Sequence, residues 1–297
     1  MKLSEPDWDL YRTFLAVLRG GSLSAAARSL GLTQPTVGRQ VEALEASLGA
    51  PLFLRSPLGL TPTALAEALR PQAEAMAATA EALLRMASGQ GQGVRGTVRL
   101  TASEVVGVEV LPPILAGLRV RHPALEIELV LSNAVDDLLR QQADIAVRMV
   151  EPRQEALLVR RLGEIPVGLY AHQTYLMRCG VPQQPEDLAD HTVIGFDRET
   201  PAIRAMRERL PAVAQLRYAL RADSDVAQLA AIRAGFGIGF CQVPLARRTP
   251  DLVRVLPAYV ELRLGTWIVM HSDLRSAPRC RAVFDGLVDG LRSHVER

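Results

Sequence analysis

The sequence predicts an α/β domain of two Rossmann-like lobes, preceded by an α+β winged helix-turn-helix domain and a long linker helix. Three observations carry this prediction. Before residue 62, short helical segments are separated by glycines. Residues 63–88 form an alanine-rich stretch whose apolar residues recur at helical spacing. From residue 97 onward, apolar runs alternate with helical stretches, which is typical of βαβ units and a parallel sheet. We therefore divide the chain into residues 1–62, 63–88, 89–96 and 97–297.

Composition restricts the class of protein. Of the 297 residues, 48% are hydrophobic, and the formal net charge is only +2, so any surface that binds nucleic acid must be local. The amino terminus carries acidic residues where a signal peptide has its apolar core, and no later segment holds ~18 uninterrupted apolar residues. We expect a cytoplasmic protein that does not associate with a membrane.

Three short helices are predicted before residue 50. The first covers residues 7–19 and ends at Gly20-Gly21. The second, SAAARSL, follows Ser22 and ends at Gly31, and the third runs from an N-cap at Thr33 to Ser47, with Gly49 as its stop signal. Two helices joined by a tight turn that contains glycine form a helix-turn-helix arrangement.

The third helix has one apolar stripe and one polar face. Its stripe is formed by residues at helical spacing, Val37, Val41, Leu44 and Leu48. Pro35 lies in the first turn, where its missing N–H has no intrahelical partner. Gly38 costs the helix about 1 kcal/mol relative to alanine. Two explanations remain open for it: close approach of the helix backbone to a DNA phosphate, or close packing against the second helix.

A hairpin and a long helix follow. Residues 51–62 have two short apolar runs around Ser56-Pro57-Leu58-Gly59, a sequence that favours the turn of a wing. The helix over residues 63–88 contains Pro71, which can kink it, and is too long and too one-sided to stand alone. We expect it to pair with a copy of itself through Leu65, Leu69, Met76 and Leu83, and packing of this face within the same chain is the alternative. The glycine-rich residues 89–96 form a flexible linker.

The remaining residues are predicted to form the two lobes. Lobe I takes about residues 97–165 and 268–293, with strands TVRLTA, LEIELVL and ADIAVRM and a helix near 134–141. Lobe II takes about residues 166–267, beginning with PVGLYA, and includes TVIGF, QLRYALRA, a helix over 225–234 and GIGFCQV. The run TWIVMH and a closing helix at 277–293 return to the first lobe.

Residues 22–53 read SLSAAARSLGLTQPTVGRQVEALEASLGAPLF, followed by Arg55 and LTP at 60–62. This stretch closely resembles the DNA-binding domain of the LysR-type transcriptional regulators. The similarity continues in GTVRLTAS at 96–103, LPP at 111–113, RHP at 121–123, DIAVR at 144–148 and AGFGIG at 234–239. Leu58, where the family often has arginine, and Ala64, where glycine is common, depart from the pattern.

The resemblance implies a function and an assembly. It implies a transcriptional regulator that binds double-stranded DNA and is switched by a small-molecule effector held between two lobes like those of periplasmic binding proteins. It also implies a homodimer joined through the long helix, and a homotetramer built from two such dimers.

The predicted DNA-binding residues fall into two groups. We expect bases to be read by the polar side chains and ring carbons of the third helix, Gln34, Pro35, Thr36 and Gln40. We expect phosphates to be contacted by Ser22, Arg28, Arg39 and Arg55. Ser22 as a simple helix cap and Arg28 as a solvated charge remain equal alternatives.

The effector is expected at the carboxyl ends of the parallel strands. The candidate residues are Thr101, Ala102, Ser103, Ser132, Asn133, Arg148, Phe196, Asp223 and Ser224. Arg148 and the serine hydroxyls favour a small organic acid, whereas Glu104 and Asp223 favour an amine, so a zwitterion or a neutral molecule stays open. Ser103 and Ser132 as helix N-caps, and Arg148 in a surface ion pair, are the alternatives.

Other classes of protein have weaker support. We find no hydrolase, zinc-protease or phosphate-loop motif, and GFGIG at 235–239 has the wrong spacing for a dinucleotide site, so neither an enzyme nor a cofactor is expected. Cys179, Cys241 and Cys280 are far apart and indicate no metal site, and a redox pair of Cys179 with Cys241 requires the fold to bring them together. A cytoplasmic receptor that binds a small molecule without regulating DNA is the first alternative, and an enzyme built on the two-lobed domain ranks behind it.

Overall fold

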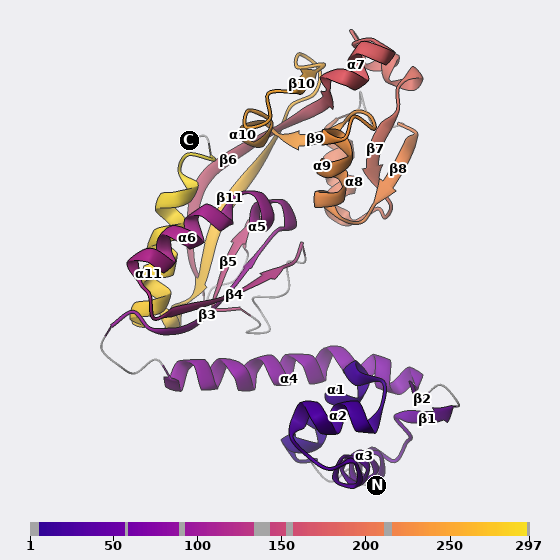
Figure 1. Cartoon of the computed structure of the whole chain (residues 1–297), viewed down its shortest axis with the longest axis vertical. Coiled ribbons are helices and arrows are strands. Elements are labelled where there is room, and N and C mark those ends of the chain that lie inside the picture. Colours follow the sequence, from indigo (N-terminus) through magenta and orange to yellow (C-terminus); the bar gives the residue numbers. More distant parts are fainter. Residues whose placement is uncertain are drawn as a thin grey trace. The chain divides into compact units, whose positions relative to one another are not determined.

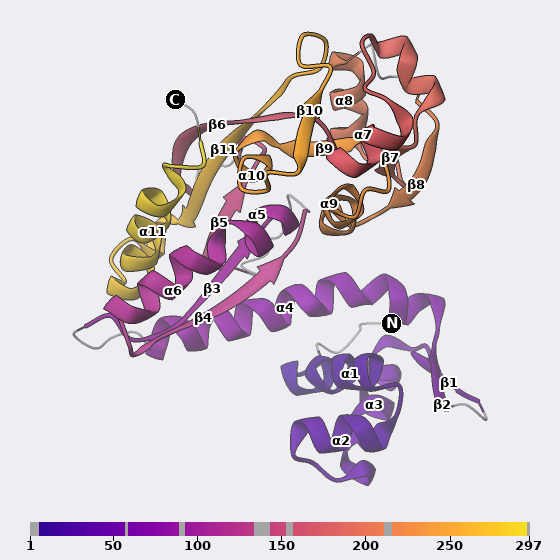
Figure 2. The same ribbon diagram turned by 45° about the horizontal axis from the view of Figure 1, so that its top comes forward.

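The computed structural model describes residues 6–56, 59–88, 93–133, 143–152, 157–210 and 216–295. These residues fall into two compact units, which divide between Leu84 and Arg85. Figure 1 shows the elements of each unit, and Figure 2 shows them from a second direction.

Three helices form the centre of the first unit: α1 (Trp8–Gly20), α2 (Leu23–Leu30) and α3 (Gln34–Leu48). Each is followed by a glycine in the left-handed conformation, at Gly21, Gly31 and Gly49, with φ of 65°, 67° and 69°. A residue with a Cβ is strained in this conformation, so glycine at these points ends the helices where the sequence predicts.

The three helices are held together by a small apolar core. Phe14 of α1 and Leu44 of α3 are fully buried and belong to the same cluster as Leu52, which follows α3. Val37 and Val41 of α3 are buried with Val17 of α1 in a second cluster. The apolar stripe predicted for the third helix is therefore the face that packs against the rest of the unit.

The hairpin and the long helix, as far as Leu84, complete the first unit. β1 (Phe53–Ser56) pairs antiparallel with β2 (Gly59–Pro62), as predicted for the wing, whereas Leu58 in its turn lies outside the described residues. α4 (Ala64–Ser88) is one helix with Pro71 inside it. Ala66 and Ala73 of α4 are buried in the cluster of Phe14 and Leu44, so the first part of α4 is packed onto this unit.

In the described part of the second unit, seven strands form one sheet. Six of them lie in the order β10-β6-β11-β5-β3-β4, and the seventh, β9, pairs with β6 outside this order. β3 lies parallel to β4 and β5, whereas β6 and β11 are antiparallel to each other. The bounds are β3 (Gly96–Ala102), β4 (Leu125–Leu131), β5 (Ile145–Arg148), β6 (Leu157–His172), β9 (Gly239–Gln242), β10 (Leu252–Val255) and β11 (Leu262–His271).

β6 and β11 run side by side through both lobes, as Figure 1 shows. The sequence pattern predicts a new set of strands from about residue 166, but the strand starts at Leu157 and continues to His172. It bends at a bulge where Thr266 pairs with Gly163 and Trp267 pairs with Arg161. Charged residues beside the bulge, Arg160, Arg161 and Glu164, interrupt the apolar pattern of β6. The sequence of this one strand therefore looks like two separate apolar runs. The sequence pattern does not predict β10.

Helices cover both lobes of the second unit. Lobe I carries α5 (Glu104–Glu109), α6 (Leu111–Arg121), η3 (Ser272–Leu274) and α11 (Pro278–Leu291). Lobe II carries α7 (Gln173–Cys179), η1 (Pro185–Asp190), α8 (Pro201–Arg209), α9 (Asp225–Arg233), α10 (Val243–Ala246) and the parallel pair β7 (Val193–Phe196) and β8 (Tyr218–Ala222). The helix predicted near 134–141 lies outside the described residues. The described helices include none that is both long and apolar enough to cross a bilayer.

Candidate functional site

The amino-terminal end of α3 is exposed, and its first turn is capped by Thr33. Oγ1 of Thr33 accepts a hydrogen bond from the N–H of Thr36 over 3.4 Å, and the two threonine hydroxyls lie 2.8 Å apart. Gln34 and Pro35 are exposed in this turn. Because the cap and the proline satisfy the first turn without using Gln34, its amide remains available at the surface.

Gln34 is contacted from α2. The hydroxyl of Ser24 donates a hydrogen bond to Oε1 of Gln34 over 3.1 Å. Both side chains are exposed, so the bond lies on the same surface as the end of α3. Sequence reasoning missed Ser24, although its position two residues after the helix cap Ser22 places it on the first turn of α2.

Gln40 is turned toward α1 rather than outward. The hydroxyl of Thr13, which is buried, donates to Oε1 of Gln40 over 2.7 Å, and Gln40 itself is half-buried. The amide oxygen of Gln40 is therefore used to hold α3 against α1. The sequence pattern placed Gln40 with Arg39 on the outer face, but two adjacent helical residues point about 100° apart, and the second of them turns inward here.

The predicted phosphate contacts differ in their surroundings. Arg28 and Arg39 are exposed, and neither forms an ion pair with another described residue. Ser22 caps α2, because its Oγ accepts the N–H of Ala25 over 3.2 Å. The backbone of Arg55 lies in β1 opposite Leu60, and its side chain is outside the described part of the structure.

Gly38 is not required by packing within the chain. A Cβ built on Gly38 would meet only Cδ1 of Leu23 within 4 Å, at 3.8 Å, which is an ordinary van der Waals distance. Since α2 leaves room for a methyl group at this position, the second explanation offered by the sequence, close packing against α2, does not account for the glycine.

In lobe I, the predicted effector residues meet at the carboxyl ends of three strands. Ala102 at the end of β3 pairs with Leu131 of β4 on one side and Val147 of β5 on the other. Arg148 follows Val147 and is 5% exposed, so the alternative of a surface ion pair is wrong. Nη2 of Arg148 donates to Oγ1 of the buried Thr101 over 3.0 Å. The guanidinium therefore lies beneath the strand ends.

The helix that follows β3 is capped by a residue that comes shortly after the neighbouring strand β4. Ser103 holds the N-cap position of α5 but makes no side-chain cap bond. Instead, Oδ1 of Asn133 accepts the N–H of Glu104 over 3.2 Å, and the N–H of Ser132 donates to the carbonyl of Ala102 over 2.9 Å. The hydroxyl of Ser103 is thus not used to cap its own helix.

Two hydrogen bonds cross from lobe I to lobe II beside these residues. Nδ2 of Asn133 donates to Oδ2 of Asp225 over 3.1 Å, and the hydroxyl of Ser224 donates to Oε2 of Glu104 over 2.8 Å. Ser224 also caps α9, since its Oγ accepts the N–H of Ala227 over 3.4 Å. We name Glu104, Asn133, Ser224 and Asp225 the cross-lobe cluster.

Asp225 is the member of this cluster that sequence reasoning missed. Burial raises the pKa of its carboxyl group and the charge of Glu104 raises it further, against the opposing hydrogen bond from Asn133. Its position at the start of α9, matching Glu104 at the start of α5, was the available signal. Of the other predicted residues, Asp223 is exposed, and Phe196 lies half-buried opposite Ala222 at the ends of β7 and β8.

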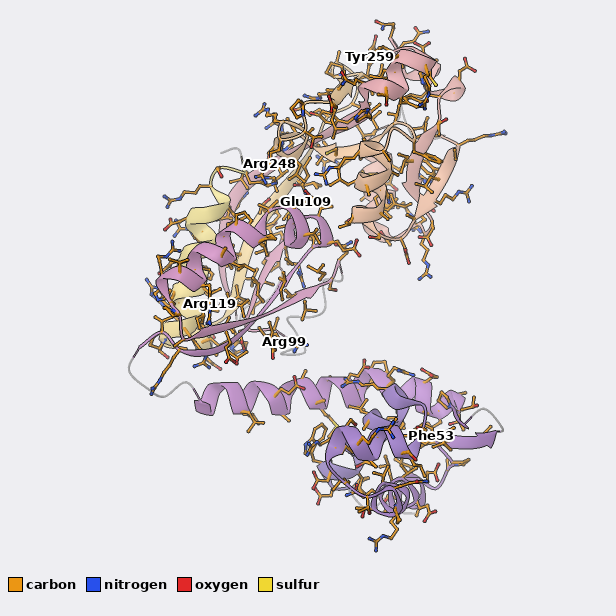
Figure 3. All side chains as sticks on the ribbon, in the orientation of Figure 1. Phe53, Arg99, Glu109, Arg119, Arg248 and Tyr259 are labelled. Atoms are coloured by element: carbon orange, nitrogen blue, oxygen red, sulfur yellow. The ribbon has the colours of Figure 1, made fainter. Side chains whose placement is uncertain are left out.

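A second connection joins the lobes between α5 and α9. Glu109 at the end of α5 accepts two hydrogen bonds from Arg233, over 2.7 and 2.8 Å, and this pairing holds the pKa of Glu109 below its usual range. Nη1 of Arg248 donates to the carbonyl of Glu109 over 3.2 Å, and Figure 3 labels both residues where the lobes meet. Glu109 and Arg233 are 124 residues apart in the sequence, so no local pattern could reveal their pairing.

A groove of about 710 Å³ lies elsewhere on the second unit, between α6 and α11. Ile114 and Gly117 of α6 line it together with Gly286 and Gly290 of α11. None of the predicted effector residues lines this groove.

The remaining chemistry of the described residues is sparse. They contain no group of three or more histidine, cysteine or acidic residues that could hold a metal ion. None of the three cysteines forms a disulfide, and Cys179 is exposed whereas Cys241 is buried. Burial raises the pKa of the Cys241 thiol to about 11, so this residue stays protonated at neutral pH and is a poor redox partner.

Comparisons with known proteins agree with this arrangement. Residues 8–67 match the model of the bacterial regulatory helix-turn-helix protein, lysR family, and residues 91–292 match the LysR substrate binding domain. The Mau operon transcriptional activator of Paracoccus denitrificans is 30% identical over 288 residues, which cover 95% of this chain and 96% of the relative. The probable HTH-type transcriptional regulator LtrA of Klebsiella pneumoniae is 28% identical over 283 residues, covering 92% of this chain and 91% of the relative.

Solved structures share the fold. CbnR, a LysR family transcriptional regulator, has a TM-score of 0.68 at 22% identity, covering 98% of this chain and 100% of that chain. The structure of full-length CbnR with its target DNA has a TM-score of 0.65 at 22% identity, covering 97% and 99% of the two chains. The matched domains, the full-length relatives and the fold lead to one conclusion: the chain belongs to the LysR family of transcriptional regulators.

Proposed function

We propose that this chain regulates transcription by binding specific DNA sequences in the cytoplasm, as a non-enzymatic protein whose activity is set by a small molecule held between the two lobes. The observation that carries the DNA-binding half is the exposed first turn of α3. Its cap is complete and Gln34 is held from α2, so this turn presents ordered polar groups at the surface, among them the exposed amide of Gln34. A helix end of this kind fits the major groove.

The DNA-binding residues divide the work between bases and phosphates. Gln34, Pro35 and Thr36 read base edges, since Gln34 and Pro35 are exposed and Thr36 lies half-buried in the same turn, while Arg28, Arg39 and Arg55 contact phosphates. Ser22 contributes as a helix cap whose O–H remains able to donate to a phosphate. Gln40 serves mainly to hold α3 in place through Thr13.

A second copy of the chain covers the outer face of α4. Leu65, Met76 and Leu83 are 38%, 43% and 62% exposed, which is costly for large apolar side chains on one helix face. Leu69 instead packs partly against the first unit's own core, so it contributes less to the dimer than the sequence pattern indicates. Two such dimers form the tetramer.

The effector binds where the strand ends of lobe I face the start of α9. Four members of the cross-lobe cluster satisfy one another there, so a ligand enters by replacing their bonds. Glu104 and Asp225 oppose a simple anion, whereas Arg148 and Thr101 lie beneath the same strand ends. A zwitterion or a small organic acid that also carries a hydrogen-bond donor matches this mixture.

The decisive experiment is a gel-shift titration of the full-length chain against the intergenic DNA beside its own gene, at several salt concentrations. A regulator binds this DNA with an affinity that falls steeply with salt, because bound arginines release counterions. A receptor that only binds small molecules shows no such affinity, and that result would reject the proposal.

A further inference from the structure

A side chain of α2, Ser24, holds a side chain of α3, Gln34, by a hydrogen bond. Ser24 lies on the first turn of α2, and Gln34 is the first residue of α3. The hydroxyl of Ser24 donates to Oε1 of Gln34 over 3.1 Å, while Nε2 of Gln34 is bound to no other described residue. In this bond the hydroxyl acts as the donor, so the amide lies with its oxygen toward α2 and its NH₂ group directed away; a reversed amide would require the hydroxyl to accept instead.

The orientation of this amide matters because its two ends are chemically opposite. The oxygen accepts hydrogen bonds and the NH₂ group donates them, and at an exposed position the amide rotates readily between two orientations. An A·T pair presents the N7 acceptor and the N6 donor of adenine in one order along the major groove, and a T·A pair presents them in the reverse order. An amide held in one orientation therefore matches adenine on one strand only.

We infer that Ser24 is a positioning residue for base recognition: it holds the amide of Gln34 so that the chain distinguishes A·T from T·A at one operator position. The carbonyl oxygen has two lone pairs, so Oε1 can keep its bond to Ser24 while it accepts a hydrogen from N6 of adenine. The inference rests on the proposed role of Gln34 in reading a base.

A direct contact of Ser24 with a phosphate is the competing role, and the two differ in what they change. A phosphate contact strengthens binding to every sequence alike. A positioning role changes the preference at a single base pair and leaves the other positions as they are. Affinities for a set of duplexes that differ at one base pair therefore separate the two roles.

The experiment begins with selection of duplexes from a random-sequence double-stranded DNA pool by the full-length chain. Gln34→Ala identifies the position whose preference depends on Gln34, and affinities are then measured for duplexes with A·T or T·A at that position. Ser24→Ala is expected to reduce the ratio of the two affinities roughly threefold to tenfold, as the loss of one hydrogen bond implies. Ser24→Thr keeps the hydroxyl and is expected to restore the ratio.

Ser29→Ala is the matched control, because Ser29 is an exposed serine of the same helix whose hydroxyl donates to the carbonyl of Ala26. It is expected to leave the ratio unchanged. If Gln34→Ala loses the base preference but Ser24→Ala keeps the wild-type ratio of A·T to T·A affinities, the role of Ser24 is overturned while base reading by Gln34 stands. Equal weakening of all duplexes by Ser24→Ala also overturns it. If Gln34→Ala keeps the wild-type preference at every position, the proposed base reading by Gln34 fails as well.

Discussion

Substitution of Gly38 by alanine is expected to make the protein more stable and its binding to DNA weaker. Gly38 lies inside α3, where glycine costs about 1 kcal/mol relative to alanine. The added methyl group would meet Leu23 at 3.8 Å, so no clash reduces the gain. For a unit of this size, about 1 kcal/mol corresponds to a rise in Tm of roughly 4–8 °C.

The same methyl group is expected to weaken DNA binding if, as we propose, the backbone of α3 approaches a phosphate closely at Gly38. We expect a loss of about tenfold, which corresponds to about 1.4 kcal/mol. Stability is measured by thermal denaturation and affinity by fluorescence anisotropy with a duplex from the DNA beside the gene.

Ala46→Gly provides the matched control, since Ala46 is exposed in the same helix beyond its DNA-facing turn. It is expected to lower stability by a similar amount and to leave the affinity unchanged. If Gly38→Ala stabilises the chain and binds DNA as tightly as the wild type does, the close approach to a phosphate is refuted. A destabilised Gly38→Ala variant would refute the packing geometry itself.

Three further predictions concern the rest of the molecule. Met76→Glu combined with Leu83→Glu is expected to be a monomer in light scattering. This monomer is expected to bind DNA poorly, because binding at one half-site no longer raises the effective concentration of a second recognition helix at the other. Ala78→Glu, which lies about 200° around the helix from Met76, is the control and is expected to remain a dimer. Burial lowers the pKa of His294 from 6.5 to about 4, so the contribution of its neutral imidazole to stability is fully present above pH 6.5 and is lost as the pH falls toward 4. In urea titrations, the slope of the unfolding free energy against pH is expected to be flatter in His294→Gln by up to about 1.4 kcal/mol per pH unit, and an unchanged slope would contradict the assignment. A thermal-shift screen of small organic acids and amino acids is expected to find a stabilising effector whose effect shrinks in Ser103→Ala and Asp225→Asn, and undiminished stabilisation in both variants would move the site elsewhere.

Local signals in the sequence were sufficient for features that depend on neighbouring residues. Ser22 and Thr33 cap their helices, and Gly31 and Gly49 follow the helix ends, because capping and left-handed turns involve only a few consecutive residues. The strands β3, β4, β5, β7, β8 and β9 follow from the same alternating patterns, whereas β10 and the first part of β6 do not. These parts of the fold could be predicted.

Features that depend on the approach of distant segments could not. The inward turn of Gln40 requires Thr13, which lies 27 residues away, and the packing of Leu69 depends on the core of the first unit. The bond between Ser224 and Glu104 joins residues 120 apart. In each case the residue's own pattern fits two environments, and tertiary contact decides between them.

The shared strands β6 and β11 have a consequence for how the second unit unfolds. Each strand pairs with the other in both lobes, on either side of the bulge near Gly163, so melting of either lobe removes pairing partners beside the other. In neither lobe is the seven-stranded sheet complete without β6 and β11. We therefore expect the two lobes to denature as one cooperative body, with a single calorimetric transition of the second unit whose calorimetric and van't Hoff enthalpies agree.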